Sequence, residues 1–336
     1  MGMAANRRAG ICTRASNTLA AYGLIAFASG AGAAPTRAIS ELTPSVTLHL
    51  GGTADWVAVT PEAIWVGSTM PNAVHAIDPE TNRVVVTVPL PGNPCAGLAV
   101  GFGALWVPLC AKPNVLARVD LKSHALGLVQ GVGPADREGG ITTSPDSVWI
   151  VSDARSTLTR IDPTTDRVRQ QIRIAPGSYN PKYFAGAIWV TRADGAEATV
   201  VAADSGRVEG SVPTGPGPRF LTAGGGSVWT LNQGDGSLTR IDAQARRATA
   251  TIALGTPGHG GDIDADGNVV LTTLAKVPLS VIDVATSSLR CQWIGPGGDS
   301  LAISGGSVWL TDYDRGDVSR YELEKVVAGC LAPAPK

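Results

Sequence analysis

An internal repeat of about 40 residues is the feature that most constrains how this chain can fold. A small residue and an aliphatic residue precede Trp at six places, and the steps between successive copies lie between 39 and 43 residues. The copies are Ala63-Ile64-Trp65, Ala104-Leu105-Trp106, Ser147-Val148-Trp149, Ala187-Ile188-Trp189, Ser227-Val228-Trp229 and Ser307-Val308-Trp309, with an altered copy at Asn268-Val269-Val270. Seven such units indicate a repeat fold.

A second marker keeps the same register and follows each copy by roughly a dozen residues. Its copies are Ala76-Ile77-Asp78, Arg118-Val119-Asp120, Arg160-Ile161-Asp162, Ala202-Ala203-Asp204, Arg240-Ile241-Asp242, Val281-Ile282-Asp283 and Arg320-Tyr321-Glu322. We expect the recurring Asp to cap a turn by accepting a backbone N–H two residues on.

Each unit can be divided into four short strands rich in Val, Ile, Leu and Thr. In the second unit these strands are predicted at 97–100, 104–109, 115–121 and 125–132. A four-stranded sheet cannot bury both of its faces alone, whereas sheets packed radially cover one another. The sequence therefore predicts an all-β, seven-bladed β-propeller with antiparallel blades, in which each Trp fills the gap between neighbours.

Closure of the ring is predicted from the two ends of the repeat. The seventh unit has strands near 300–303, 308–311 and 318–323 but no good fourth strand, and the segment 45–50 lies ahead of the first unit. That segment can supply the missing outer strand and so remove an exposed edge. We place the propeller at 45–323, between an N-terminal tail at 34–44 and a C-terminal tail at 324–336.

Residues 1–33 have the layout of a secretory signal peptide. Arg7, Arg8 and Arg14 precede the apolar run 19–28, and Ala31-Gly32-Ala33 suits cleavage. The alternative is an uncleaved membrane helix, for which the run is short, and the Arg pair leaves a twin-arginine route open. We expect a periplasmic or secreted protein, with no later membrane span and a monomeric state.

Removal of the signal would leave 24 basic and 28 acidic residues, a net charge near −4. That balance argues against a nucleic-acid partner held through phosphates. Four cysteines would remain, and four cysteines allow three pairings. The repeat register favours Cys95–Cys110 and Cys291–Cys330, which an oxidising compartment permits. The alternative is four buried free thiols.

Two units resemble the YVTN-type and virginiamycin B lyase-like propellers. They are Ser307 to Tyr321 and Ser227 to Asp242, and the resemblance extends over roughly 52–323. For the lyase it implies two His on successive blades and a metal, such as Mg²⁺, held by carboxylates. His259-Gly260 matches the first His position, but the second is Gly298, and Pro296 stands two residues before it. Asp312 would take the place of a metal-binding Glu.

Other candidate metal positions have simpler interpretations. Asp262, Asp264 and Asp266 imitate the opening of a calcium loop, but the twelfth position is Thr273 rather than Glu. We interpret Asp266-Gly267 as a β-turn instead. The remaining histidines, His49, His75 and His124, are isolated and show no metal spacing. No cofactor is predicted, and a divalent metal only if the chain is a lyase.

The starts of the first strands and the ends of the second strands share one rim of a propeller. Besides His259 and Asp312, the predicted rim positions are Arg137, Glu138, Lys182, Arg192, Arg219, Asn232, Asp299 and Tyr313. Three or four cations converging on a funnel suit an anionic or carboxylate-bearing ligand. The alternative is a solvated rim with no ligand.

The leading hypothesis is an exported binding propeller that presents this funnel to a small anionic or peptide-like ligand or to a cell-envelope protein. The alternative is an enzyme, a C–O lyase or a lactonase-like hydrolase, with His259 as the base and Asp312 as metal ligand or acid.

Overall fold

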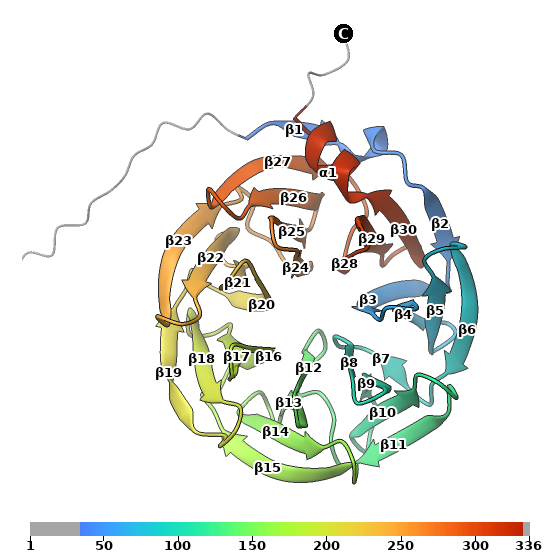
Figure 1. Cartoon of the computed structure of the whole chain (residues 1–336), viewed down its shortest axis with the longest axis vertical. Helices are drawn as coiled ribbons and strands as arrows, with labels where there is room; N and C mark the ends of the chain where they lie inside the picture. Colours follow the sequence, from blue (N-terminus) through green and yellow to red (C-terminus); the bar gives the residue numbers. More distant parts are fainter. Residues whose placement is uncertain (1–33, 332–336) are drawn as a thin grey trace, which may run out of the picture. The chain divides into compact units, whose positions relative to one another are not determined.

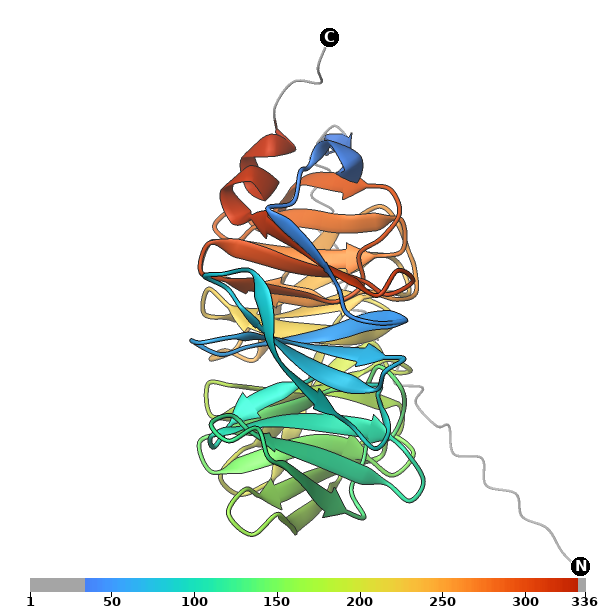
Figure 2. The ribbon, with the colours of Figure 1, turned by 90° about the vertical axis from the view of Figure 1, so that its right-hand side faces the viewer.

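The protein is a seven-bladed β-propeller, as the repeat predicted (Figure 1). The structure, a computed structural model, describes residues 34–331; the predicted signal peptide at 1–33 lies outside the described residues. Seven sheets surround a central axis, and the side view shows them as one disc (Figure 2). No helix in the described range is long and apolar enough to cross a membrane.

Each blade runs from an inner strand beside the central axis to an outer strand at the periphery of the disc. The first blade is β3 (Thr53–Val59), β4 (Ile64–Thr69), β5 (Ala73–Asp78) and β6 (Arg83–Pro89). The second is β7 (Asn93–Pro94), β8 (Ala99–Gly101), β9 (Ala104–Cys110), β10 (Val115–Asp120) and β11 (Leu126–Gln130). The third is β12 (Ile141–Ser144), β13 (Ser147–Ser152), β14 (Thr157–Asp162) and β15 (Arg167–Arg173). The fourth is β16 (Ser178–Phe184), β17 (Ala187–Arg192), β18 (Glu197–Ala202) and β19 (Val208–Pro213). The fifth is β20 (Pro218–Gly224), β21 (Ser227–Asn232), β22 (Ser237–Asp242) and β23 (Arg247–Ala253). The sixth is β24 (Ile263–Ala265), β25 (Val269–Leu274), β26 (Val277–Asp283) and β27 (Ser288–Ile294).

The seventh blade closes the ring with a strand from the start of the chain, as predicted. It contains β28 (Leu301–Ser304), β29 (Ser307–Asp312) and β30 (Asp317–Glu322), and β2 (Val46–His49) is its outer strand. β2 runs antiparallel to β30, with Val46 opposite Arg320 and His49 opposite Asp317. The first and last blades are therefore joined by backbone hydrogen bonds.

The two segments expected to be tails are instead folded onto the sixth and seventh blades. β1 (Thr36–Ala38) pairs in parallel with β27, a short 3-10 turn covers Ile39–Glu41, and α1 (Leu323–Gly329) follows β30. Val326 of α1 is fully buried, and its carbonyl accepts a hydrogen bond from the indole of Trp293. These elements are too short to show a periodic pattern, so the sequence alone did not indicate them.

Both predicted cysteine pairs lie at disulfide distance. The Cα atoms of Cys95 and Cys110 are 5.7 Å apart, and those of Cys291 and Cys330 are 5.9 Å apart. The first pair joins the inner and second strands of the second blade, and the second ties the segment after α1 to β27. The second link holds the segment just after α1 against the sixth blade.

The repeated Trp fills the gap between blades, as expected. Each of the six has at most 2% of its surface exposed and packs into the apolar cluster of the following blade; Trp149, for example, contacts Ile188, Val190 and Val201. In the sixth unit, strand pairing places Leu271 at the Trp position, one residue after the predicted Val270. Leu271 packs against Leu301 and Val308 of the seventh blade.

The second marker also needs one correction. In the fourth unit Trp189 lies opposite Val200, so Val200-Val201-Ala202 holds the register and the predicted Ala202-Ala203-Asp204 is two residues late. Elsewhere the marker Asp caps its turn, as expected: Asp162 accepts the N–H groups of Thr164 and Thr165. These backbone hydrogen bonds are the largest cause of the lowered pKa of Asp162.

An arginine connects neighbouring blades wherever the two markers read Ser-Val-Trp and Arg; Arg160 is buried, and Arg240 and Arg320 are partly buried. Arg160 lies opposite Trp149, with its guanidinium carbon 4.9 Å from the ring centroid, and donates to Ser147 Oγ at 2.7 Å. It also reaches the fourth blade by donating to the carbonyl of Asp204 at 3.0 Å. Arg240 and Arg320 make the same set of contacts, and Arg320 spans the closed seam to Pro79. The arginine therefore links blades as well as packing on the Trp.

Replacing Arg160 by Met is expected to lower the free energy of unfolding by about 2–4 kcal/mol, because charge-assisted hydrogen bonds and a buried stacking contact are lost. Arg169, half-exposed and paired only with Asp146 at 3.4 Å, provides the control: Arg169→Met should change stability by less than about 0.5 kcal/mol. Urea unfolding of the three proteins measures both effects. Equal losses in the two variants would contradict a blade-linking role for Arg160.

Candidate functional site

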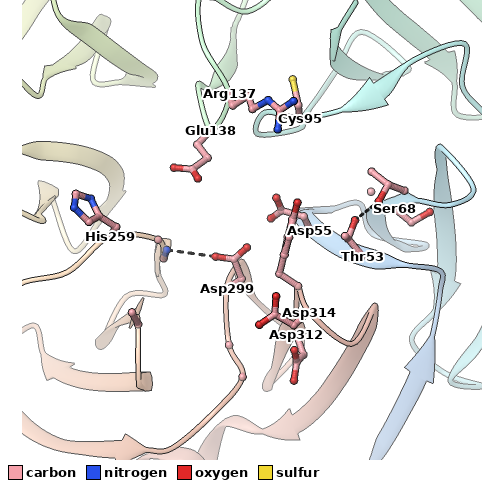
Figure 3. Close-up of a pocket in the computed structure, with 18 of the residues that line it drawn as sticks. Thr53, Asp55, Ser68, Cys95, Arg137, Glu138, His259, Asp299, Asp312 and Asp314 are labelled. Carbon is pink, nitrogen blue, oxygen red and sulfur yellow. Dashed lines mark hydrogen bonds between the residues drawn. The ribbon is translucent and has the colours of Figure 1, made fainter.

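The central channel holds two cavities, which lie in succession along the inner strands. The first, the mouth cavity, has a volume of about 430 Å³. The polar side chains at its lining are Thr53, Asp55, Ser68, Thr69, Asn93, Arg137, Glu138, His259, Lys276, Asp299, Asp312, Tyr313 and Asp314 (Figure 3). The second, the inner-strand cavity, has a volume of about 440 Å³ and is lined by residues from the inner strands of all seven blades, such as Val57, Ile141 and Lys182.

A β-bulge in β3 sets the boundary between the two cavities. The register with β4 shifts between Asp55 and Val57, and Trp56 has a φ of 57°, which is an outlier for a bulky residue. The Asp55 side chain lines the mouth cavity, whereas Trp56 lines the inner-strand cavity. Asp55 accepts hydrogen bonds from its neighbour Trp56 N at 2.7 Å and from Ser300 Oγ at 2.8 Å.

Asp55 and Asp299 form a carboxyl pair across the seam between the first and seventh blades. Burial raises the pKa of Asp55 well above its usual range, and the charge of Asp299 adds to the rise. Burial likewise raises the pKa of Asp299, against the effect of the Gly261 N–H, which donates to it at 3.4 Å. A partly buried carboxyl pair with raised pKa values holds a proton more strongly than two exposed aspartates would. Such pairs are a feature of binding and catalytic sites.

Two further aspartates lie deeper, on β24 and immediately before it. Burial raises the pKa of Asp262 to about 7. Asp262 accepts the N–H groups of Ile263 and Leu301, and Asp264 accepts the N–H of Ile303 and the hydroxyl of Thr222. Both carboxylates therefore hold the inner edge of the seventh blade. The turn predicted at Asp266-Gly267 is confirmed, with Asp266 capping the N–H groups of Asn268 and Val269.

The structure brings six of the ten predicted site residues together. The six that line the mouth cavity are Arg137, Glu138, His259, Asp299, Asp312 and Tyr313. His259 is exposed, and in Figure 3 its imidazole turns away from Asp299. Asp312 accepts the N–H of Arg315, whose guanidinium is 3.6 Å away. Asp55, which is central to the cavity, was missed; an acidic residue inside the otherwise apolar stretch Ala54–Val57 was the available signal.

The other four lie elsewhere or are engaged. Asn232 is completely buried and hydrogen-bonds Thr230, Ser237 and Thr239, so it does not reach the rim. Arg192 pairs with Glu197 at 2.7 Å, and Lys182 lines the inner-strand cavity. Arg219 pairs with Glu138 at 2.9 Å, with its guanidinium carbon 4.4 Å from the Tyr179 ring centroid.

The mouth cavity is consequently acidic, unlike the cationic funnel expected from the sequence. Its lining carries five carboxyl groups, those of Asp55, Glu138, Asp299, Asp312 and Asp314, against the cations Arg137 and Lys276. Of the three predicted rim arginines only Arg137 lines the cavity, and the sequence could not show that Arg192 and Arg219 pair with neighbouring acids. Glu138 faces Arg219, Asp312 faces Arg315, and the raised pKa values of Asp55 and Asp299 favour their neutral forms, so the lining is rich in hydrogen-bond acceptors rather than in unpaired negative charge. Such a lining favours a ligand with many N–H donors.

The donor set does not fit the metal site that the lyase resemblance implied. Within residues 34–331, no group of three His, Cys, Asp or Glu side chains is arranged to hold a metal ion. Gly298 lines the cavity where the second His would stand. We therefore derive no chemical step through a metal.

Comparison with known proteins supports the architecture. Neither protein-family models nor curated protein sequences give a match. Among solved structures, a selenomethionine-substituted virginiamycin B lyase from Staphylococcus aureus aligns with a TM-score of 0.70 and 16% identity, over 83% of this chain and 98% of that one. Because 1489 chains of solved structures match, the likeness shows the fold without choosing among activities.

Stability is expected to depend on pH through Asp262. Its folded-state pKa of about 7 lies above the unfolded value, so its stabilising contribution is full below about pH 4 and is lost as pH rises through 7. Asp262→Asn cannot ionise. The free energy of unfolding of the variant should therefore rise relative to that of the parent between pH 5 and 8, by at most about 1.4 kcal/mol per pH unit. Burial lowers the pKa of His75, so its contribution to the free energy of unfolding increases as pH rises. That contribution is the same in parent and variant and cancels in the difference between them. Urea unfolding at each pH tests this; a constant difference would contradict it.

Proposed function

We propose that this protein is an exported binding propeller that takes a small, positively charged, peptide-like ligand into the mouth cavity. The excess of carboxyl groups over cations in its lining is the observation that carries the proposal. Carboxylates accept charge-assisted hydrogen bonds from ammonium, guanidinium and peptide N–H groups. An anionic ligand would instead meet more hydrogen-bond acceptors than donors in this lining.

Asp299 and Asp312 are the groups best placed to receive such a ligand. Both have partly buried side chains, and glycine-rich loops beside them leave room for it. Gly297 is required there, because a Cβ would meet Asp312 Oδ2 at 2.9 Å and its φ is 86°. A cavity of about 430 Å³ suits a ligand of a few residues or a small metabolite.

Export is the second part of the proposal. It is supported by the signal-like composition of residues 1–33 and by two cysteine pairs at disulfide distance, which persist in oxidising compartments. The ligand or partner would then be met in the periplasm or outside the cell, where a cell-envelope peptide or protein segment of suitable charge is the kind of partner the cavity favours.

A second candidate function is acid–base catalysis in the same cavity. It is favoured by the raised pKa values of Asp55 and Asp299 in a cavity that also holds His259. The chemistry would be elimination or hydrolysis at an ester or lactone, in keeping with the lyase-like fold. The exposed, unpartnered position of His259 within the described residues makes binding the better-supported function.

Binding of fluorescently labelled tri-lysine and tri-glutamate distinguishes the charge preference. Tri-lysine should bind, more weakly at higher salt, and Asp299→Asn should weaken it at least fivefold. Asp153→Asn is the matched control, because Asp153 is an exposed aspartate after the second strand of another blade and does not line the cavity. Equal or tighter binding of tri-glutamate would rule out the proposed ligand charge.

The catalytic candidate is tested with a panel of cyclic depsipeptides and lactones, assayed by mass spectrometry. If the cavity is an active site, turnover of at least one compound should fall more than 100-fold in His259→Ala and in Asp299→Asn. Activity that survives both substitutions would exclude the site. Unchanged substrate throughout the panel would leave binding as the function of the cavity.

A further inference from the structure

We propose that the inner-strand cavity is a second ligand site, for a small carboxylate with a flat apolar body, held by Lys182 above the rings of Trp56 and Phe220. This site is separate from the mouth cavity and has the opposite charge preference. Three observations carry it: the shape and wall of the cavity, its aromatic residues, and the hydrogen-bonding groups left without partners.

The wall of this cavity is contributed by the inner strands of all seven blades. Its lining follows consecutive residues, at 56–59, 97–100, 140–143, 180–182, 220–221, 262–265 and 301–303. Most of the lining side chains are aliphatic or aromatic, but polar atoms make up the larger part of the surface that the cavity exposes. A volume of about 440 Å³ has the size of a small-molecule site.

Two aromatic rings from distant blades meet at this cavity. The rings of Trp56 and Phe220 have centroids 6.2 Å apart and are tilted by 42°, and the two residues are only 5% and 4% exposed. The bulge in β3 brings Trp56 there in a backbone conformation that costs energy for a bulky residue. Strain of this kind persists where the surrounding structure maintains it, and it clusters at ligand sites. Because both residues line the cavity, a flat apolar body would contact the small part of the rings that remains exposed.

Two donors of this cavity lack a partner in the part of the chain that the structure describes, whereas its other polar side chains are engaged: Asn180 and Thr143 donate to backbone carbonyls, and the aspartates accept. Asp262 and Asp264 each accept two hydrogen bonds from the wall. Within the described residues, Lys182 forms no side-chain hydrogen bond or ion pair, and the buried indole Nε1 of Trp56 has no acceptor. A buried donor without a partner costs about 1–3 kcal/mol. A ligand that relieves this must therefore supply acceptors, and Lys182 selects an anionic one.

A carboxylate satisfies these conditions better than a cation. Lys182 would repel a cation, and the oxygens of Asp264 that could attract one are already bound to Thr222 and Ile303. The rise in the pKa of Asp262 to about 7 keeps part of its population neutral near physiological pH, which lowers the negative charge that a carboxylate meets. The ring of the ligand supplies the apolar surface for Trp56 and Phe220.

The experiment compares three probes of one shape: benzoate, benzyl alcohol and benzylamine, titrated calorimetrically into the protein. We expect benzoate to bind at least tenfold more tightly than the other two. Lys182→Met should reduce benzoate affinity at least tenfold, and Lys182→Arg should keep it within threefold. Lys276→Met is the matched control, because Lys276 lines the mouth cavity, and it should leave benzoate binding unchanged.

Trp56→Phe provides an independent variant, since it retains the aromatic surface and removes the indole N–H; a loss of two- to tenfold is expected. Equal affinities for the three probes, no benzoate binding up to 20 mM, or unchanged binding in Lys182→Met would each overturn the second site. Tri-lysine binding should be the same in Lys182→Met as in the parent, so that failure here is distinguishable from failure of the mouth cavity as a site.

Discussion

The structure depends on how one blade covers the face of the next. A single four-stranded sheet leaves apolar surface exposed, and here the repeated Trp is inserted into the apolar cluster of the following blade. In three blades a buried or partly buried arginine orients this contact, because it stacks on the Trp and donates to a carbonyl of the neighbour. Dispersion and hydrophobic burial thus determine that blades pack, and the arginine fixes how they are placed.

Ring closure transmits that placement to the functional site. Asp55 belongs to the first blade and Asp299 precedes the inner strand of the seventh, so they are 244 positions apart in the chain and meet because the closed ring places the first blade against the last. Ser300 bonds Asp55 across the same seam. A change that loosens closure, at β2 or at the contact of Arg320 with Pro79, would therefore alter the carboxyl pair before it alters the other blades.

The repeat made the fold predictable, but not the charge of the site. Blade number, strand order and closure followed from the spacing of Trp and Asp, because those residues occupy one structural position in each unit. Register slips of one or two residues, at Leu271 and Val200, were invisible until strand pairing was known. Arg219 and Arg192 were placed near the rim, yet their partners Glu138 and Glu197 depend on side-chain geometry that spacing does not carry. Asp55 was missed because a bulge redirects it.

That bulge also explains how one channel can hold two cavities of different character. Successive residues in a regular strand point to opposite faces, whereas the extra residue at Asp55–Val57 lets Asp55 serve one cavity and Trp56 the other. On one side five carboxyl groups line the cavity; on the other, Asp262 and Asp264 are bonded to the wall, and Lys182 has no side-chain partner within the described residues. Neighbouring residues of β3 thus face two cavities with different polar groups, and the positive φ of Trp56 lies at the point of division.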